Sequence, residues 1–99
     1  MKRREGFEKL EEEIAREKAA ALGRAGERLD AALEEARALG AALDAEVDPE
    51  LRRLRLRAYE DARRRAEFAR TMLLVQREAI GLRHHRVVDQ QFPEPPRRS

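Results

Sequence analysis

Asp48-Pro49-Glu50 stands near the middle of this 99-residue chain and separates two long amphipathic patterns. Aspartate is a preferred N-cap because its carboxylate accepts a hydrogen bond from an amide of the first helical turn, and proline is favoured at the first helical position. Glu50 would lie beside the positive end of the helix dipole. We therefore predict that a second helix begins at Pro49 and that the short junction folds it back antiparallel to the first.

The residues before this junction predict one long helix, from about residue 5 to residue 47. Apolar residues recur there in alternating steps of three and four, which is typical of an amphipathic helix. They are Phe7, Leu10, Ile14, Leu22, Ala25, Leu29, Ala32, Leu33, Ala36, Leu39, Leu43 and Val47. Gly23 and Gly26 allow two interpretations: weak points that cost about 1 kcal/mol each relative to alanine, or a groove that lets another helix approach closely.

The second helix should run from about residue 49 to residue 80. One apolar stripe is expected to meet the first helix, and it comprises Leu51, Leu54, Ala58, Ala62, Ala66, Ala69, Leu73, Gln76 and Ile80. We expect Gln76 to be a buried, hydrogen-bonded residue that sets the register between the helices, in preference to a binding residue. At about 100° per residue, Phe68, Val75 and Leu82 fall on a different side, and something else must cover them.

Two alternatives remain for this second stripe. A second copy of the chain would cover it in a four-helix bundle, which we favour because a two-helix hairpin hides only one face of each helix. Alternatively, Gly81 ends the helix and the C-terminal segment folds back, since Leu82, Val87, Val88 and Phe92 are apolar. Both arrangements are compatible. A short third helix is expected at about 82–91, within a single domain of residues 1–92, followed by an extended or disordered proline-rich tail at 93–99.

The composition excludes several chemistries. The chain has no cysteine, which removes disulfides, thiolate catalysis and cysteine-based zinc sites and fits a cytoplasmic protein. His84 and His85 are adjacent, so on a helix they point about 100° apart and should face solvent, and a salt bridge of His85 with Asp89 is more expected than a metal site. The longest apolar run is far shorter than the roughly 20 residues that span a bilayer. We therefore predict no catalytic, cofactor-binding or metal residues, no membrane contact, and a protein that is not an enzyme.

Charge divides unevenly between the two halves. Residues 1–48 carry 9 basic and 13 acidic side chains, and residues 49–99 carry 13 basic and 7 acidic ones. The simpler interpretation is attraction between the helices that favours antiparallel pairing. The alternative is a nucleic-acid-associated protein that uses an arginine face on the second helix, represented by Arg52, Arg53, Arg63 and Arg64. Against it, Glu60 and Glu67 should pair locally with neighbouring arginines, and aromatic residues for base stacking are absent.

Two segments resemble a known family: LEEEIAREKAAALGRAG at residues 10–26 and VQREAIGLR at residues 75–83. They are similar to a small bacterial family of helical proteins registered as domain of unknown function 6665. The resemblance implies a small helical bacterial protein without an assigned activity, so it supplies no catalytic residues. The tail, with Pro95-Pro96-Arg97-Arg98, departs from the family pattern.

We therefore expect an all-α, long antiparallel helical hairpin that acts as a non-catalytic interaction or structural module. Its expected partner is a second copy of itself, with an unknown protein partner also possible. The expected contacts are Gly23, Gly26, Phe68, Val75 and Leu82.

Overall fold

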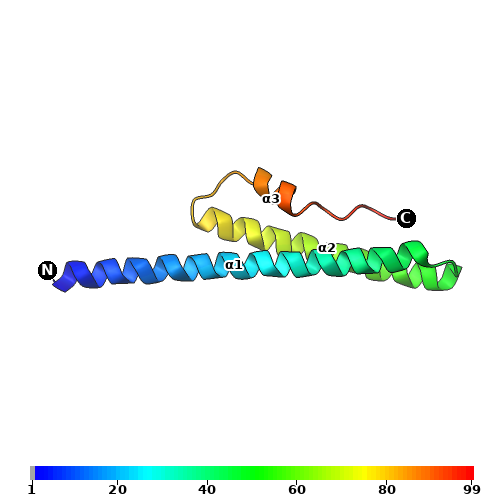
Figure 1. The fold of residues 1–99 in the computed structure, drawn as a ribbon, viewed down its shortest axis with the longest axis horizontal. Coiled ribbons are helices and arrows are strands. Elements are labelled where there is room, and N and C mark those ends of the chain that lie inside the picture. The colour runs from blue at the N-terminus through cyan, green and yellow to red at the C-terminus, as the bar shows by residue number, and fades with distance from the viewer. Residues whose placement is uncertain (1) are drawn as a thin grey trace.

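The computed structural model describes residues 2–99, and this part of the chain consists of three helices and their connections. In order they are α1 (Lys2–Ala45), α2 (Pro49–Ala79) and α3 (Arg86–Gln91). α1 and α2 lie side by side and antiparallel, and the molecule measures 73 × 21 × 14 Å (Figure 1). The prediction of an all-helical chain with two long helices packed together is confirmed. None of the helices within residues 2–99 is both long enough and apolar enough to cross a membrane.

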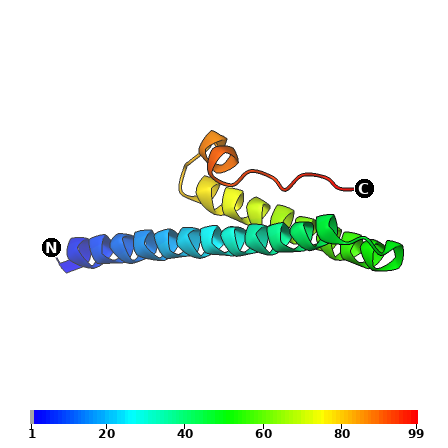
Figure 2. The same cartoon turned by 45° about the vertical axis from the view of Figure 1, so that its right-hand side comes forward.

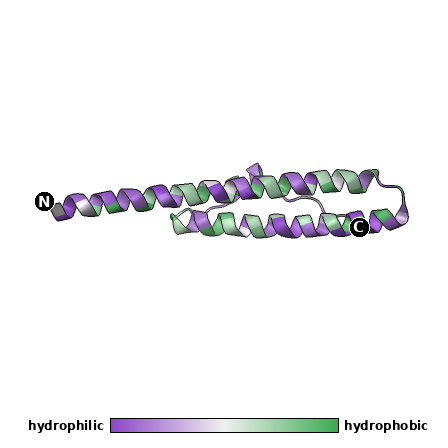
Figure 3. Ribbon diagram, turned by 90° about the horizontal axis from the view of Figure 1, so that it is seen from below, coloured by the Kyte–Doolittle hydropathy of each residue, from purple (hydrophilic) through white to green (hydrophobic). Residues whose placement is uncertain are grey.

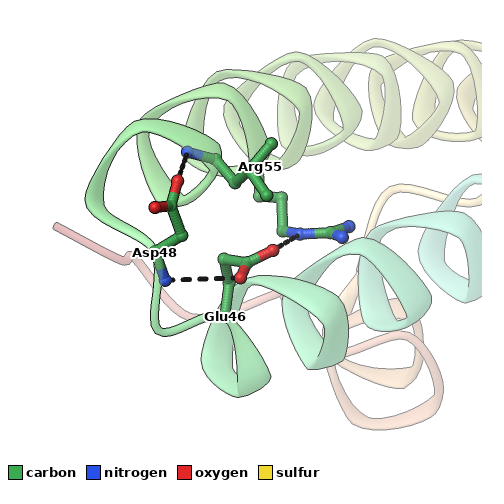
Figure 4. Close-up of polar contacts among 4 residues, drawn as sticks. Glu46, Asp48 and Arg55 are labelled. Atoms are coloured by element: carbon green, nitrogen blue, oxygen red, sulfur yellow. Dashed lines mark hydrogen bonds and ion pairs between the residues drawn. The ribbon is translucent and has the colours of Figure 1, made fainter.

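The turn between α1 and α2 is built as the sequence predicted. Asp48 is the N-cap of α2, and its Oδ2 accepts a hydrogen bond from the amide of Leu51 at 2.9 Å (Figure 4). Across the turn, Arg55 Nε donates to Glu46 Oε1 at 2.7 Å. This hydrogen bond, with a smaller contribution from the Asp48 amide, lowers the pKa of the Glu46 carboxyl below its ordinary value. The turn therefore ties the end of α1 to the first turns of α2.

The buried residues form two clusters between the helices. One cluster contains Ala25, Leu29, Leu33, Ala66, Leu73 and Val88, and the other contains Ala36, Leu43, Tyr59 and Ala62. The predicted stripe of α1 is thus confirmed from Ala25 to Leu43, with Leu22, Ala32 and Leu39 partly buried. Its two ends were wrong, because no helix covers Phe7, Leu10, Ile14 and Val47, which are exposed. Alanine at four of these ten positions, Ala25, Ala36, Ala62 and Ala66, allows the two backbones to lie close together.

The predicted stripe of α2 was partly wrong. Leu51 and Leu54 are 47% and 59% exposed, whereas Tyr59, absent from the predicted stripe, is 1% exposed. At about 100° per residue, Leu54 lies a third of a turn away from Ala66, which faces α1. Gln76 is also only partly buried, so it is not the enclosed residue that the pattern suggested.

Gly40 makes room for Tyr59. A Cβ atom at Gly40 would lie 2.9 Å from Tyr59 Cε1, which is closer than packed atoms allow, and 3.3 Å from Tyr59 Cδ1, which is a tight contact. The ring is almost completely buried and fills the space that the missing side chain leaves. This is the one close approach of a glycine to a side chain of the other helix among the described residues.

α2 ends at Ala79, one residue before the predicted end, and Gly81 follows its C-cap Ile80 as the helix-ending glycine that the sequence analysis considered. Gly81 has a φ of +88°, a conformation that glycine adopts without steric cost. The amide of Leu82 donates to Arg77 O and the amide of Gly81 donates to Glu78 O, both at 3.0 Å, which is the pattern of a Schellman motif. The chain then continues without helix to Arg86, so the third helix begins four residues later than expected.

Of the two histidines in this connection, which were both predicted to face solvent, only His84 does so. His84 is exposed, but the His85 side chain is only 19% exposed, and its Nε2 lies 3.0 Å from Glu78 Oε1. Arg77 Nη2 donates to the backbone oxygen of His84 at 2.9 Å and its Nε donates to His85 Nδ1 at 3.3 Å. His85 therefore helps to hold the connection against α2, and it does not pair with Asp89. Within residues 2–99, no three His, Asp or Glu side chains gather as a metal-binding group.

Candidate interaction surfaces

The C-terminal segment folds back along one side of the hairpin (Figures 1 and 2). Val88 of α3 is 3% exposed and belongs to the cluster of Leu29 and Ala66, while Phe92 packs against the same cluster. An ion pair between Asp89 and Arg70 fixes α3 on α2. The C-terminal segment therefore folds back as the alternative expected, but it packs on the cluster of Leu29 and Ala66 and does not cover the stripe of Phe68 and Val75 that it was expected to cover.

The tail after α3 continues in an extended form toward the turn between α1 and α2. Arg63 Nε donates to Pro95 O at 3.3 Å, Tyr59 Oη donates to Pro96 O at 2.5 Å, and Arg52 Nη1 donates to Ser99 O at 3.1 Å. These three donors lie on one side of α2 and follow one another along the tail. The proline-rich tail, predicted as extended or disordered, is thus extended and bound to the hairpin.

Arg98 is the side chain of the tail that enters the hairpin. Its Nη2 lies 3.1 Å from Asp44 Oδ2 of α1, and its guanidinium carbon lies 5.6 Å from the centre of the Tyr59 ring, within cation–π range. Arg98 is thereby placed between an acidic residue of α1 and an aromatic residue of α2. Its neighbour Arg97 is exposed.

We call the seat of the tail the Tyr59 groove, defined by Leu33, Ala36, Gly40, Asp44, Tyr59 and Arg63. The tail does not fill it, because a cavity of about 310 Å³ remains between the tail and the hairpin. Leu33, Ala36 and Gly40 give this cavity an apolar wall, and Asp44 and Arg37 form its polar edge. The groove can therefore hold a larger segment than the one that occupies it.

The second apolar stripe of α2 lies elsewhere. Phe68 and Val75 are 67% and 50% exposed, and Met72 between them, which the sequence analysis did not single out, is 38% exposed. Phe68 is displaced by about 200° from Ala66 around the helix axis. The tail, on the side of Tyr59 and Arg63, does not cover this outer stripe, which we define as Phe68, Met72 and Val75.

The remaining predicted contacts are spread over the molecule. Leu82 is 41% exposed and follows the turn at Gly81, outside α2, so the helical spacing that grouped it with Val75 does not extend to it. Gly23 and Gly26 have open space around them, with no atom within 4 Å of the position of a Cβ. Neither glycine is used for close packing within the chain.

The first part of α1 extends beyond the end of α2. Residues 3–20 are exposed, and Phe7, Leu10 and Ile14 among them are 62%, 52% and 42% exposed. Figure 3 shows this extension as mainly hydrophilic with a few apolar positions, free of a neighbouring helix. The extension thus presents an interrupted apolar stripe.

The arginines of the predicted nucleic-acid face are divided among several contacts. Arg52 and Arg63 hold the tail, Arg64 forms an ion pair with Asp61, and Arg53 is exposed. Of the six ion pairs among the described residues, none involves Glu60 or Glu67, so the expected local pairs of these two residues are not formed. Two ion pairs connect α2 to the first half of the chain, Arg65 to Glu35 of α1 and Arg55 to Glu46 just after α1, both at 2.7 Å, as the charge asymmetry predicted.

Comparisons with family models, curated proteins and solved structures find no match to this chain.

Proposed function

We propose that this chain is a non-catalytic helical interaction module that acts as a homodimer. Two hairpins would pack through the outer stripe of Phe68, Met72 and Val75 and form a four-helix bundle. The observation that carries the proposal is the exposure of this stripe although the C-terminal segment is already folded onto the hairpin. The C-terminal segment lies on the other side of α2 and cannot cover the outer stripe, so we infer that a partner supplies the cover.

The energetics support a second copy. Fully burying a phenylalanine or valine side chain contributes about 1.5–3 kcal/mol, and Phe68 is two-thirds exposed. In a two-fold symmetric interface every contact occurs twice, so the stripe alone contributes several kcal/mol. Association costs at least about 4 kcal/mol in lost freedom, so further burial is required. The extension with Phe7, Leu10 and Ile14 offers that additional apolar surface.

The remaining parts of the proposal follow from the sequence. The resemblance to the bacterial family of unknown function 6665, a cytoplasmic location and the absence of catalysis are predictions, and they agree with a module whose activity is binding.

Molar mass in solution, measured by light scattering over a range of protein concentrations, tests the dimer. The wild-type chain should have the mass of two copies, and Phe68→Glu and Val75→Glu should have the mass of one, because a dimer would bury the new charge twice. Val47→Glu is the matched control, since it introduces the same change at a valine that is 92% exposed in the turn. It should remain dimeric.

Circular dichroism of each variant would establish that its helices are retained. A monomeric wild-type chain would contradict the proposal. Dimeric Phe68→Glu and Val75→Glu variants would place the interface on another surface, with Gly23, Gly26 and the α1 extension as the next positions to test.

Binding of nucleic acid is a second proposal, favoured by the basic balance of residues 49–99 and by the exposure of Arg53. It has less support because Arg52, Arg63 and Arg64 already make contacts within the chain. Replacing Arg53 and Arg64 with glutamine should weaken binding to duplex DNA. The slope of the logarithm of the binding constant against the logarithm of salt concentration should become shallower by about one for each phosphate contact that is lost. Equal binding by the variant and the wild-type chain would dismiss this role.

A further inference from the structure

The Tyr59 groove binds the tail through features that any extended proline-rich segment shares. Proline residues have no amide hydrogen, and their runs adopt an extended helix whose carbonyl oxygens remain available for hydrogen bonds. Arg63 Nε and Tyr59 Oη donate to two consecutive carbonyls, those of Pro95 and Pro96. Aromatic side chains beside such donors are the usual means of recognising proline-rich peptides.

The groove also selects a basic residue at a fixed place. Arg98, two residues after Pro96, pairs with Asp44 and lies over the Tyr59 ring. An aspartate and an aromatic face together favour arginine, whose planar cation can interact with both. The preferred sequence is therefore a proline pair with an arginine two positions after its second proline.

The tail occupies this groove without filling it. Pro93, Glu94, Pro96 and Arg97 are exposed, and the cavity of about 310 Å³ remains beneath the tail. A segment tethered in the same chain has an effective concentration on the order of millimolar, so weak contacts are sufficient to seat it. A free peptide with the same contacts and a better fit to the cavity would compete with it.

We propose that the Tyr59 groove is a binding site for an extended proline-rich segment of another protein, with an arginine two residues after the prolines. The chain's own tail acts as a competitor that occupies the site until such a segment displaces it. This site lies on the opposite side of α2 from the outer stripe, so it is independent of the proposed dimer.

Fluorescence anisotropy with a labelled synthetic peptide of residues 92–99 tests the proposal on the full-length chain. Arg98→Glu in the protein weakens the tail and leaves the groove intact, because the change replaces the attraction to Asp44 by repulsion. We expect this variant to bind the peptide roughly ten-fold more tightly than the wild-type chain does, from the loss of one ion pair and one cation–π contact in the competing tail.

Arg97→Glu is the matched control, since it makes the same charge change at the exposed neighbouring residue, and it should bind the peptide as the wild-type chain does. Adding Tyr59→Phe to the Arg98→Glu protein removes one hydrogen bond and keeps the ring, so it should weaken the peptide complex about five-fold. A peptide with alanine in place of Pro95 and Pro96 should bind more weakly than the parent peptide.

Three results would overturn the proposal. The first is an absence of peptide binding to the Arg98→Glu protein at millimolar concentration. The second is an equal gain in Arg97→Glu and Arg98→Glu, which would assign the effect to net charge. The third is a wild-type dimer that becomes monomeric with Arg98→Glu, because the occupant of the groove would then be the tail of a second copy.

Discussion

Gly40 lies in the last turns of α1 and faces the ring of Tyr59. Its replacement by alanine should therefore have two opposing effects on the free energy of unfolding, each of known size. Alanine is the better helix former and should stabilise α1 by about 1 kcal/mol. Its Cβ, however, would lie 2.9 Å from Tyr59 Cε1. The ring must then move, or the helices must separate.

The ring has little freedom to move. It is 1% exposed, its hydroxyl donates to Pro96 O, and Arg98 lies over its face. Overpacking of a well-filled core costs about 1–3 kcal/mol. After the gain in helix propensity is subtracted, we expect Gly40→Ala to lower the free energy of unfolding by about 1 kcal/mol, which corresponds to a fall in melting temperature of about 4–8 °C for a domain of this size.

Gly23→Ala is the matched control, because it is the same substitution in the same helix at a position with open space. It should raise the free energy of unfolding by about 1 kcal/mol through helix propensity alone. Denaturant unfolding of both variants at one protein concentration measures the difference, which should be about 2 kcal/mol. Keeping the concentration fixed matters because dimerisation would otherwise shift the apparent stability.

Equal stabilisation by Gly40→Ala and Gly23→Ala would refute the argument that Gly40 is required for the seat of Tyr59. The control has a second use. If Gly23→Ala or Gly26→Ala converts a dimer into a monomer, the two glycines form the helix-packing groove that the sequence allowed.

Three further predictions concern the hairpin itself. Asp48→Ala removes the N-cap of α2 and should reduce the free energy of unfolding by about 1 kcal/mol, measured by denaturant unfolding, whereas an unchanged value would mean that Pro49 alone starts the helix. Because the pKa of Glu46 is lowered in the folded chain, its contribution to stability is present above the unfolded pKa and is lost as pH falls through the folded pKa. An NMR titration should give Glu46 a midpoint below its ordinary value, and this midpoint should move upward in Arg55→Gln. An unmoved midpoint would exclude Arg55 as the cause. Amide exchange should be much faster in residues 3–18 than in residues 25–43, since few contacts protect the α1 extension, and equal protection at low protein concentration would contradict its exposure.

Local chemistry made the hairpin predictable. The N-cap at Asp48, the proline after it and Gly81 after the end of α2 each act on the backbone within a few residues. All three have the helix-starting or helix-ending role that the sequence analysis considered for them. The spacing of apolar residues in α1 likewise identified Leu29, Leu33 and Leu43 as buried, because an amphipathic helix has one face to hide.

The seat of the tail was not predictable in this way. Tyr59 is buried because Gly40 leaves space for its ring and because Pro96, 37 residues away, accepts its hydroxyl hydrogen. Tyr59 lies close to the face of Ala62 and Ala66, and this position in the helix was a signal for burial. Its hydroxyl, however, argued against burial as long as no hydrogen-bond acceptor for it was known. The apolar pattern predicted Leu51 and Leu54 to be buried, but both are exposed, since apolar residues near a helix end need not be covered.

The burial of Tyr59 gives the protein an internal optical reporter. The chain has one tyrosine and no tryptophan, so its near-ultraviolet absorption and emission above the phenylalanine background come from this single ring. A seated tail keeps the phenol bonded to a carbonyl and shields it from water. Departure of the tail would expose the ring, and the unmodified chain would thereby signal the state of its groove without any attached dye.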